Sequence, residues 1–100
     1  MSQFDHTAID DVIHGRLRLG IMAYLSTVSP APFTELKAKV NATDGNLSTH
    51  LAKLEEARYV RIEKKFVDKK PRTLVHLTSA GRAAWIDYLK RLQALISAAE

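Results

Sequence analysis

Cysteine is absent from the sequence, and glycine and proline occur only four and three times in 100 residues. The lack of cysteine excludes disulfide bonds, cysteine-ligated zinc or iron–sulfur sites and thiol-based redox sensing. No apolar run approaches the roughly 18 residues of a membrane-spanning helix, and residues 1–11 lack the basic and apolar regions of a secretory leader. We therefore expect a cytoplasmic protein that has no membrane partner.

Sequence motifs of enzymes are missing as well. The chain has no glycine-rich phosphate loop and no nucleophile elbow. His6, Asp10 and His14 would lie along one face of a helix, but three ligands spread over two turns are too far apart to share one ion. The sequence therefore predicts no enzyme, no cofactor and no metal site.

The basic residues are concentrated in the middle of the chain. The net charge is +4, with 15 Lys and Arg against 11 Asp and Glu, and residues 37–72 hold ten of the basic residues but only five of the acidic ones. This segment alone carries +5, so the remainder of the chain is nearly neutral. A basic segment of this kind suits a polyanion such as nucleic acid, although charge alone also fits a solvated basic surface.

The first helix is predicted from a long apolar pattern. Apolar residues recur every three or four positions over residues 8–28, which is the spacing of one helix face. We expect this helix to be interrupted near His14 and Gly15, and to stop before the two prolines in residues 29–32.

Two further helices are predicted close together. Thr34 is a suitable N-cap for a short second helix that ends near Asn41, and Thr43 or Asp44 would cap a third helix. The third helix presents three leucines on one face, Leu47, Leu51 and Leu54. A separation of only three residues between two helices indicates a helix-turn-helix.

An alternating pattern and then another helix follow. Residues 60–66 predict one strand, residues 68–71 a turn, and residues 73–77 a second strand, which together make a β-hairpin with a basic tip. A final helix, capped by Thr78, is expected over about residues 79–98. The predicted fold is α+β but mainly α: a winged helix-turn-helix with a three-helix core, a two-stranded wing and a long C-terminal helix, in one domain over residues 1–100.

The order of these elements is suited to DNA binding. The major groove admits one α-helix, and the third helix would turn its polar residues outward if its leucines face the core. Asn46 can pair with adenine, and the basic hairpin tip can reach the neighbouring backbone or minor groove. The candidate DNA-binding residues are Gly45, Asn46, Ser48, Thr49, His50, Lys53, Lys65, Lys69, Lys70 and Arg72.

Each of these features also has a purely structural interpretation. Polar residues at a helix start are frequently caps, and a lysine-rich turn is frequently a solvated loop. His50 either donates to a phosphate or packs across the turn between the helices. The indication of DNA binding therefore comes from the order of the elements rather than from any one of them.

The most specific motifs are NLSTHL at residues 46–51, LEEA at residues 54–57 and LTSAGR at residues 77–82. They resemble the MarR/ArsR-like winged-helix regulators, and in particular the small single-domain members. The resemblance implies a dimer that binds a pseudo-palindromic operator, with recognition helices in successive major grooves. Arg58 departs from the pattern, because such proteins usually have glycine there, and this leaves the geometry of the helix end open. The metal-ligand clusters of ArsR-type sensors are missing, which argues against metal sensing.

The last helix carries a long apolar stripe with a 4-3-4 spacing, which is typical of paired helices. One domain of 100 residues is too small to cover the whole stripe. We expect it to pair with a second copy, assisted by Phe4 and Ile9. The candidate dimerisation residues are Trp85, Tyr88, Leu89, Leu92, Leu95 and Ile96.

We therefore expect a sequence-specific transcriptional regulator that acts as a homodimer on double-stranded DNA. Two alternatives remain: a winged-helix module that binds another protein, and a nonspecific, chromatin-type DNA binder. No separate sensing domain is evident, so a small-molecule effector would have to bind at the dimer interface.

Overall fold

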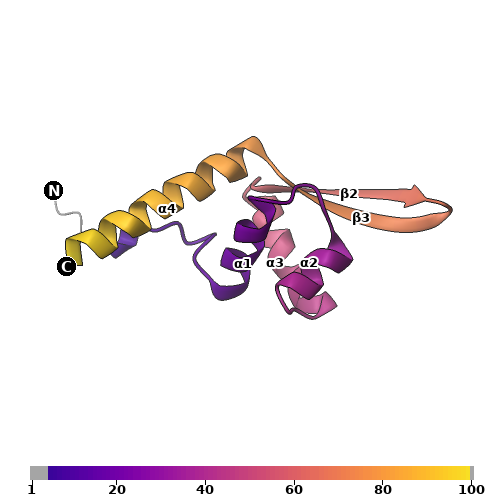
Figure 1. Ribbon diagram of the computed structural model, residues 1–100, viewed down its shortest axis with the longest axis horizontal. Coiled ribbons are helices and arrows are strands. Elements are labelled where there is room, and N and C mark those ends of the chain that lie inside the picture. Colours follow the sequence, from indigo (N-terminus) through magenta and orange to yellow (C-terminus); the bar gives the residue numbers. More distant parts are fainter. Residues whose placement is uncertain (1–4, 100) are drawn as a thin grey trace.

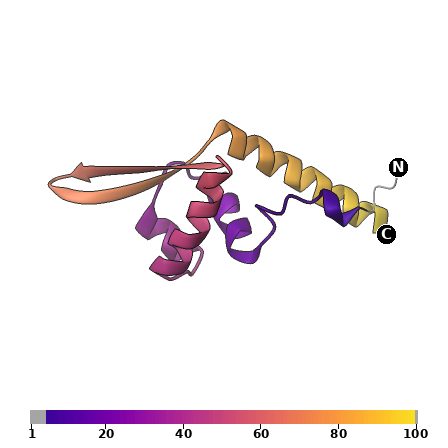
Figure 2. The ribbon, with the colours of Figure 1, turned by 180° about the vertical axis from the view of Figure 1, so that it is seen from behind.

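The computed structural model describes residues 5–99 and shows an elongated molecule of 56 × 25 × 21 Å (Figure 1). A helical core lies in the middle, a β-hairpin projects from one end and a long helix runs to the other (Figures 1 and 2). The elements are η1 (His6–Ala8), α1 (Arg16–Leu25), β1 (Ala31–Pro32), α2 (Phe33–Lys39), α3 (Asp44–Glu56), β2 (Val60–Val67), β3 (Lys70–Leu77) and α4 (Ser79–Ala99). The predicted winged helix-turn-helix fold is confirmed.

The predicted interruption near His14 and Gly15 is confirmed, because Gly15 is the N-cap of α1, but residues 9–14 before it do not form the predicted helix. Residues 11–13 form a turn, and the α-helix begins only at Arg16 and ends at Leu25. The Asp10 carboxylate accepts a hydrogen bond from the backbone nitrogen of Val12 at 2.8 Å, which gives the backbone an alternative to helix. Ile13 is nevertheless fully buried. The apolar spacing correctly indicated a segment that faces the core, but not its conformation.

The helix-turn-helix consists of α2 and α3. The N-cap of α2 is Pro32 and not the predicted Thr34, because pairing within the sheet keeps the chain extended up to Pro32. Asn41, between the helices, has a left-handed backbone with φ 53°, which asparagine tolerates better than most residues. Thr43 caps α3, as predicted: its hydroxyl accepts from the backbone nitrogen of Asn46 at 3.1 Å.

The sheet has three antiparallel strands in the order β1-β3-β2, where two were predicted. A two-residue strand is too short to produce an alternating pattern, so β1 was missed. The hairpin turn contains only Asp68 and Lys69, both with positive φ, and this two-residue turn suits the twist of paired strands. Lys70 and Pro71, predicted to lie in the turn, are therefore the first residues of β3.

The end of α3 is fastened to the start of α4. Arg58 has a left-handed backbone with φ 67°, so the conformation usual for glycine at this position is kept without glycine. Thr78 donates to the carbonyl oxygen of Arg58 at 2.7 Å and accepts from the nitrogen of Gly81 at 2.9 Å, which confirms the predicted cap. Gly81 lies against the backbone of Tyr59 with no room for a Cβ.

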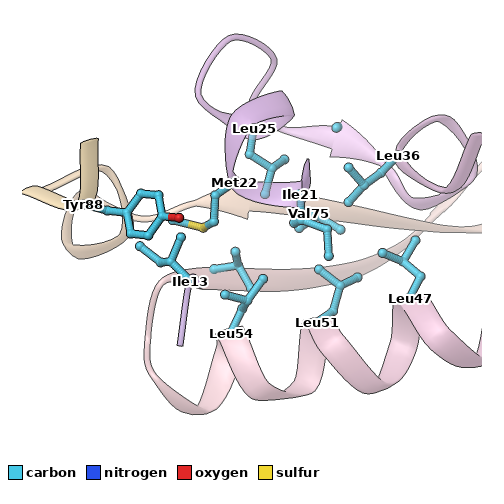
Figure 3. Packing of buried hydrophobic residues seen from close by; sticks show 12 residues of the cluster. Ile13, Ile21, Met22, Leu25, Leu36, Leu47, Leu51, Leu54, Val75 and Tyr88 are labelled. Atoms are coloured by element: carbon cyan, nitrogen blue, oxygen red, sulfur yellow. The ribbon is translucent and has the colours of Figure 1, made fainter. Parts of the chain in front are cut away.

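The buried core joins α1, α2, α3, β3 and α4 (Figure 3). The three leucines of α3 are buried, as predicted. Tyr88 of α4 belongs to the same buried cluster as Met22 and is 1% exposed, and its hydroxyl is 3.0 Å from Nδ1 of His14. Tyr88 therefore belongs to the core of its own chain, which corrects its assignment to a dimer surface. Residue spacing alone does not separate the inner from the outer side of a wide stripe.

Candidate nucleic-acid interface

The outward face of α3 is polar. Burial of Leu47, Leu51 and Leu54 fixes the rotation of the helix about its axis, as the close view of the core shows (Figure 3). The side chains on the opposite side are exposed to solvent. They are Gly45, Asn46, Ser48, Thr49, Ala52 and Lys53.

The exposed polar side chains of α3 are not used as caps. The cap is provided by Thr43, which bonds only the backbone nitrogen of Asn46. Within residues 5–99, no side-chain hydrogen bond engages Asn46, Ser48 or Thr49. The structural interpretation of these residues as caps is therefore not supported, and their donors and acceptors are available to a ligand.

His50 lies at the contact between α3 and α1. Its Nδ1 is 3.2 Å from Nη1 of Arg18, whose Nε donates to the carbonyl oxygen of Val12 at 2.6 Å. Burial, together with the charges of Arg18 and Lys53, lowers the pKa of His50, so the neutral ring accepts from the guanidinium. Of the two roles left open, the structure favours packing between helices. Arg18 was missed, because a basic residue in an apolar helix gives no signal of such a contact.

The wing carries its basic residues around the tip. Lys65 pairs with Arg72 across the strands, Lys69 is in the turn and Lys70 follows it, and all four side chains are exposed. Residues directly opposite each other share a face of a hairpin, so Lys65 and Arg72 lie on the face that turns away from the core. The predicted basic tip is present.

A groove of about 640 Å³ separates α3 from the wing. Ser48, Ala52 and the acidic Glu55 line it on the α3 side, and Ile62, Lys64 and Thr73 line it on the wing side. Lys64 was not among the predicted residues, because it lies on the mainly apolar side of its strand and outside the basic tip. An ammonium group and two hydroxyls beside a helix are suitable ligands for a phosphate.

Two acidic groups near α3 and the wing have polar partners within the chain. Oε1 of Glu63 lies 2.9 Å from Nε2 of His76 on the neighbouring strand. This hydrogen bond is the main reason that the pKa of Glu63 is lowered, and Lys65 and Arg61 add to the effect. On α3, Asp44 pairs with Nζ of Lys37 at 2.9 Å. The lowered pKa keeps Glu63 ionised, so its charge offsets part of the positive charge of the wing.

A second exposed surface lies on α4. Ile86, Leu89 and Ile96 are 47%, 44% and 48% exposed and follow helical spacing along one side. Trp85 and Leu92 pack instead against their own core, and Leu95 is half-buried. Ile86 was missed, because it falls outside the 4-3-4 spacing that begins at Trp85. Ile9 is half-buried against the core, and Phe4 lies outside the described residues.

The residues once considered for a metal have other partners. Asp10 accepts from the hydroxyl of Tyr59 at 2.6 Å, and His14 contacts Tyr88. The described residues contain no group of three potential ligands positioned for one ion. Among the helices described, none has the length and apolar character needed to cross a bilayer.

Known proteins resemble this chain over most of its length. A family model described as a winged helix DNA-binding domain matches residues 17–96. An uncharacterised protein of Methanocaldococcus jannaschii is 36% identical over 78% of this chain and 85% of its own length.

Solved structures agree with this result. A transcriptional regulator homologue from Pyrococcus horikoshii OT3 has a TM-score of 0.84 and 32% identity, covering 89% of this chain and 88% of that one. A MarR family transcriptional regulator from Silicibacter pomeroyi has a TM-score of 0.66 and 25% identity, covering 88% of this chain and 56% of that one.

Proposed function

Because the chain belongs to the family of winged helix DNA-binding domains and is a transcriptional regulator of the MarR type, not an enzyme, we propose that it acts as a homodimer on a pseudo-palindromic operator. In this proposal α3 enters the major groove and the wing reaches the adjacent minor groove. The proposal keeps the expected cytoplasmic location of the protein.

The observation that carries the proposal is the division of α3 into two faces. The leucine face is used entirely by the core, whereas the side chains of Asn46, Ser48 and Thr49 are exposed and take no part in the hydrogen bonds of residues 5–99. An amide and two hydroxyls at the start of a helix are the groups that read base edges and phosphates. Gly45 has nothing within 4 Å of a Cβ position, so it leaves this end of the helix slim enough for close approach.

The basic residues have a different role in the proposal. Lys53 on α3, and Lys65, Lys69, Lys70 and Arg72 on the wing, would neutralise phosphates and release counterions. Lys64 and Ser48 would hold the phosphate strand that passes through the groove between α3 and the wing. His50 is left out of the contact set, because Arg18 occupies its Nδ1.

The dimer would form through α4. Ile86, Leu89 and Ile96 give a stripe of half-exposed apolar side chains on a helix that leaves the body of the molecule (Figures 1 and 2). Two copies of such a helix can bury each other's stripe. The half-sites of the operator would then be centred about 10 base pairs, or a small multiple of that, apart.

The test is selection of bound sequences from a random library, followed by fluorescence polarisation at several salt concentrations. We expect Asn46→Ala and Thr49→Ala to reduce the ratio of affinities for the selected and a scrambled sequence. Lys69→Ala should weaken both sequences equally and lower the slope of log affinity against log salt by about 1. Lys90→Ala, which removes the same charge from α4, is the control and should change neither quantity.

The two alternatives give different results in this experiment. An affinity ratio near one for the unaltered protein would favour the nonspecific DNA binder. The absence of binding to any DNA at low salt would favour the protein-interaction module. Either outcome would overturn the proposed operator recognition.

A further inference from the structure

Phe66 is an aromatic residue that is largely exposed to solvent. Its side chain is 76% exposed, the largest value among the large hydrophobic residues that the structure describes. It lies near the end of the wing, where its cross-strand partner is Pro71, also exposed. Exposed apolar side chains are common singly, but a phenylalanine at the tip of a projecting arm lacks any packing role in its own fold.

The position of Phe66 on the hairpin fixes the direction in which it faces. Val60 and Ile62, two residues apart on the same strand face, pack in or against the core, and Lys64 continues that face along the groove. Phe66 is next in the alternation. It therefore lies on the side of the wing that carries α3, just beyond the groove, as the projection of the hairpin past α2 and α3 illustrates (Figures 1 and 2).

The charges around Phe66 indicate what kind of surface covers it. Residues 64–72 include five basic side chains and a single acidic one, Asp68. A second copy of this wing would be repelled by that charge, and an apolar protein surface would have to desolvate it. A polyanion that also has apolar surface can bind both the basic side chains and the exposed ring of Phe66. The minor groove of DNA has this character, with phosphates at its rims and deoxyribose along its sides.

We propose that Phe66, backed by Pro71, is an apolar wedge that inserts into the minor groove of DNA next to the major groove occupied by α3. Lys64, which shares the strand face of Phe66, and Lys69 in the turn grip the flanking phosphate strands. Insertion of an apolar side chain partly unstacks a base step, so the wing favours a flexible pyrimidine–purine step at its position. This inference rests on the proposed function and adds to it a contact that carries no charge.

Because Phe66 carries no charge, its contribution to affinity can be measured separately from that of the phosphate contacts. Phe66→Ala should reduce the affinity for the selected operator by a factor of about 10 to 100, because the ring no longer becomes buried on binding. The slope of log affinity against log salt should stay that of the unaltered protein, since no counterion release is lost. Phe66→Leu keeps an apolar wedge and should recover most of the affinity. Thermal unfolding of both variants should match that of the unaltered protein, because the ring packs against no core residue.

A second measurement reports whether the base step at the wing becomes unstacked. An operator with 2-aminopurine at the pyrimidine–purine step facing the wing should become more fluorescent when the unaltered protein binds, and not when Phe66→Ala binds. Equal affinity of Phe66→Ala and the unaltered protein would overturn the inference alone. So would a reduced salt slope in Phe66→Ala, which would mean that the wing had lost its phosphate contacts. Failure of the unaltered protein to bind any DNA would instead overturn the proposed function.

Discussion

The α-carbon of Gly81 faces the carbonyl oxygen of Tyr59 so closely that a Cβ added there would lie 2.0 Å from that oxygen. Tyr59 lies three residues after the end of α3, and Gly81 is in the first turn of α4. The same carbonyl accepts a hydrogen bond from the backbone nitrogen of Thr78 at 3.1 Å. The contact thus joins the proposed recognition helix to the proposed dimerisation helix, and it sets the angle at which they diverge.

Gly81→Ala should be strongly destabilising. The added carbon meets backbone rather than a movable side chain, so α4 must shift, at a cost of about 3 kcal/mol. Chemical denaturation measures this cost. Gly45→Ala is the matched control: its Cβ has no neighbour within 4 Å, and alanine is the better helix former, so stability should rise by about 0.5 kcal/mol. Equal effects of the two substitutions would contradict the close contact.

Tyr59 should contribute stability that disappears at high pH. Its hydrogen bond to Asp10 and its burial raise the pKa of Tyr59 to about 12, against 10.0 for the free side chain. The unfolded chain therefore loses the phenol proton first, and the contribution is complete below pH 10 and declines between pH 10 and 12. Below pH 10, Tyr59→Phe should cost about 1.5 kcal/mol, the value of a hydrogen bond to a charged acceptor.

The measurement is the difference in unfolding free energy between the two proteins from pH 8 to 12. Tyr24→Phe is the control: the hydrogen bond to Glu35 also raises the pKa of Tyr24, but the site is exposed and screened by water, so its loss should cost little at any pH. If the difference in unfolding free energy stays constant up to pH 12, the pKa of Tyr59 is not raised in the folded protein.

His50 should make the protein less stable in acid. Burial and the neighbouring charges of Arg18 and Lys53 lower its pKa from 6.5, so the unfolded chain binds the proton first as the pH falls. The neutral ring thus favours folding above pH 6.5, and this advantage is lost as the pH drops through the lowered pKa. His50→Gln keeps an acceptor for Arg18 but does not titrate. Its melting temperature should fall less than that of the unaltered protein between pH 7.5 and 5; an identical fall would contradict the assignment.

If the exposed apolar residues of α4, Ile86, Leu89 and Ile96, form the dimer interface, a charge placed among them should weaken self-association. Leu89→Lys should weaken self-association by about tenfold or more, because the ammonium group would have to lose water in the interface. Ala98→Lys adds the same charge nine residues further on, which is half a turn around the helix and thus on the far side. Sedimentation velocity over a concentration series should show a loss of dimer for the first variant only. If both variants dimerise like the unaltered protein, α4 does not form the interface.

Much of this architecture could be predicted because it depends on local rules. Thr43 and Thr78 cap helices by side-chain chemistry that is visible in a few residues, and the leucines of α3 reveal their face by spacing alone. The start of α1 was misplaced because the turn around Asp10 keeps Ile13 in the core just as a helix would.

The remaining errors concern contacts between distant segments. Tyr88 and Ile86 lie on the same helix, and only the packing of α1 and the N-terminal segment against α4 decides which one is buried. His50 meets Arg18 from 32 residues away. Such pairs depend on tertiary geometry, which hydrophobic periodicity does not describe. The exposure of Phe66 was hidden for the same reason, since alternation predicted a core side without showing where the core ends.

The short length of β1 has a consequence for the solubility of the protein. β1 reaches along β3 only to the Pro32–Leu74 pair, so within residues 5–99 the outer part of β3 has a strand neighbour on one side only. Such an edge can recruit strands from other molecules, and proline and lysine are the residues that discourage this. Pro71, Lys70 and Arg72 stand along that edge. The residues proposed to hold DNA would therefore also protect the free protein from aggregation, and a wing stripped of its charges should precipitate before its affinity is measured.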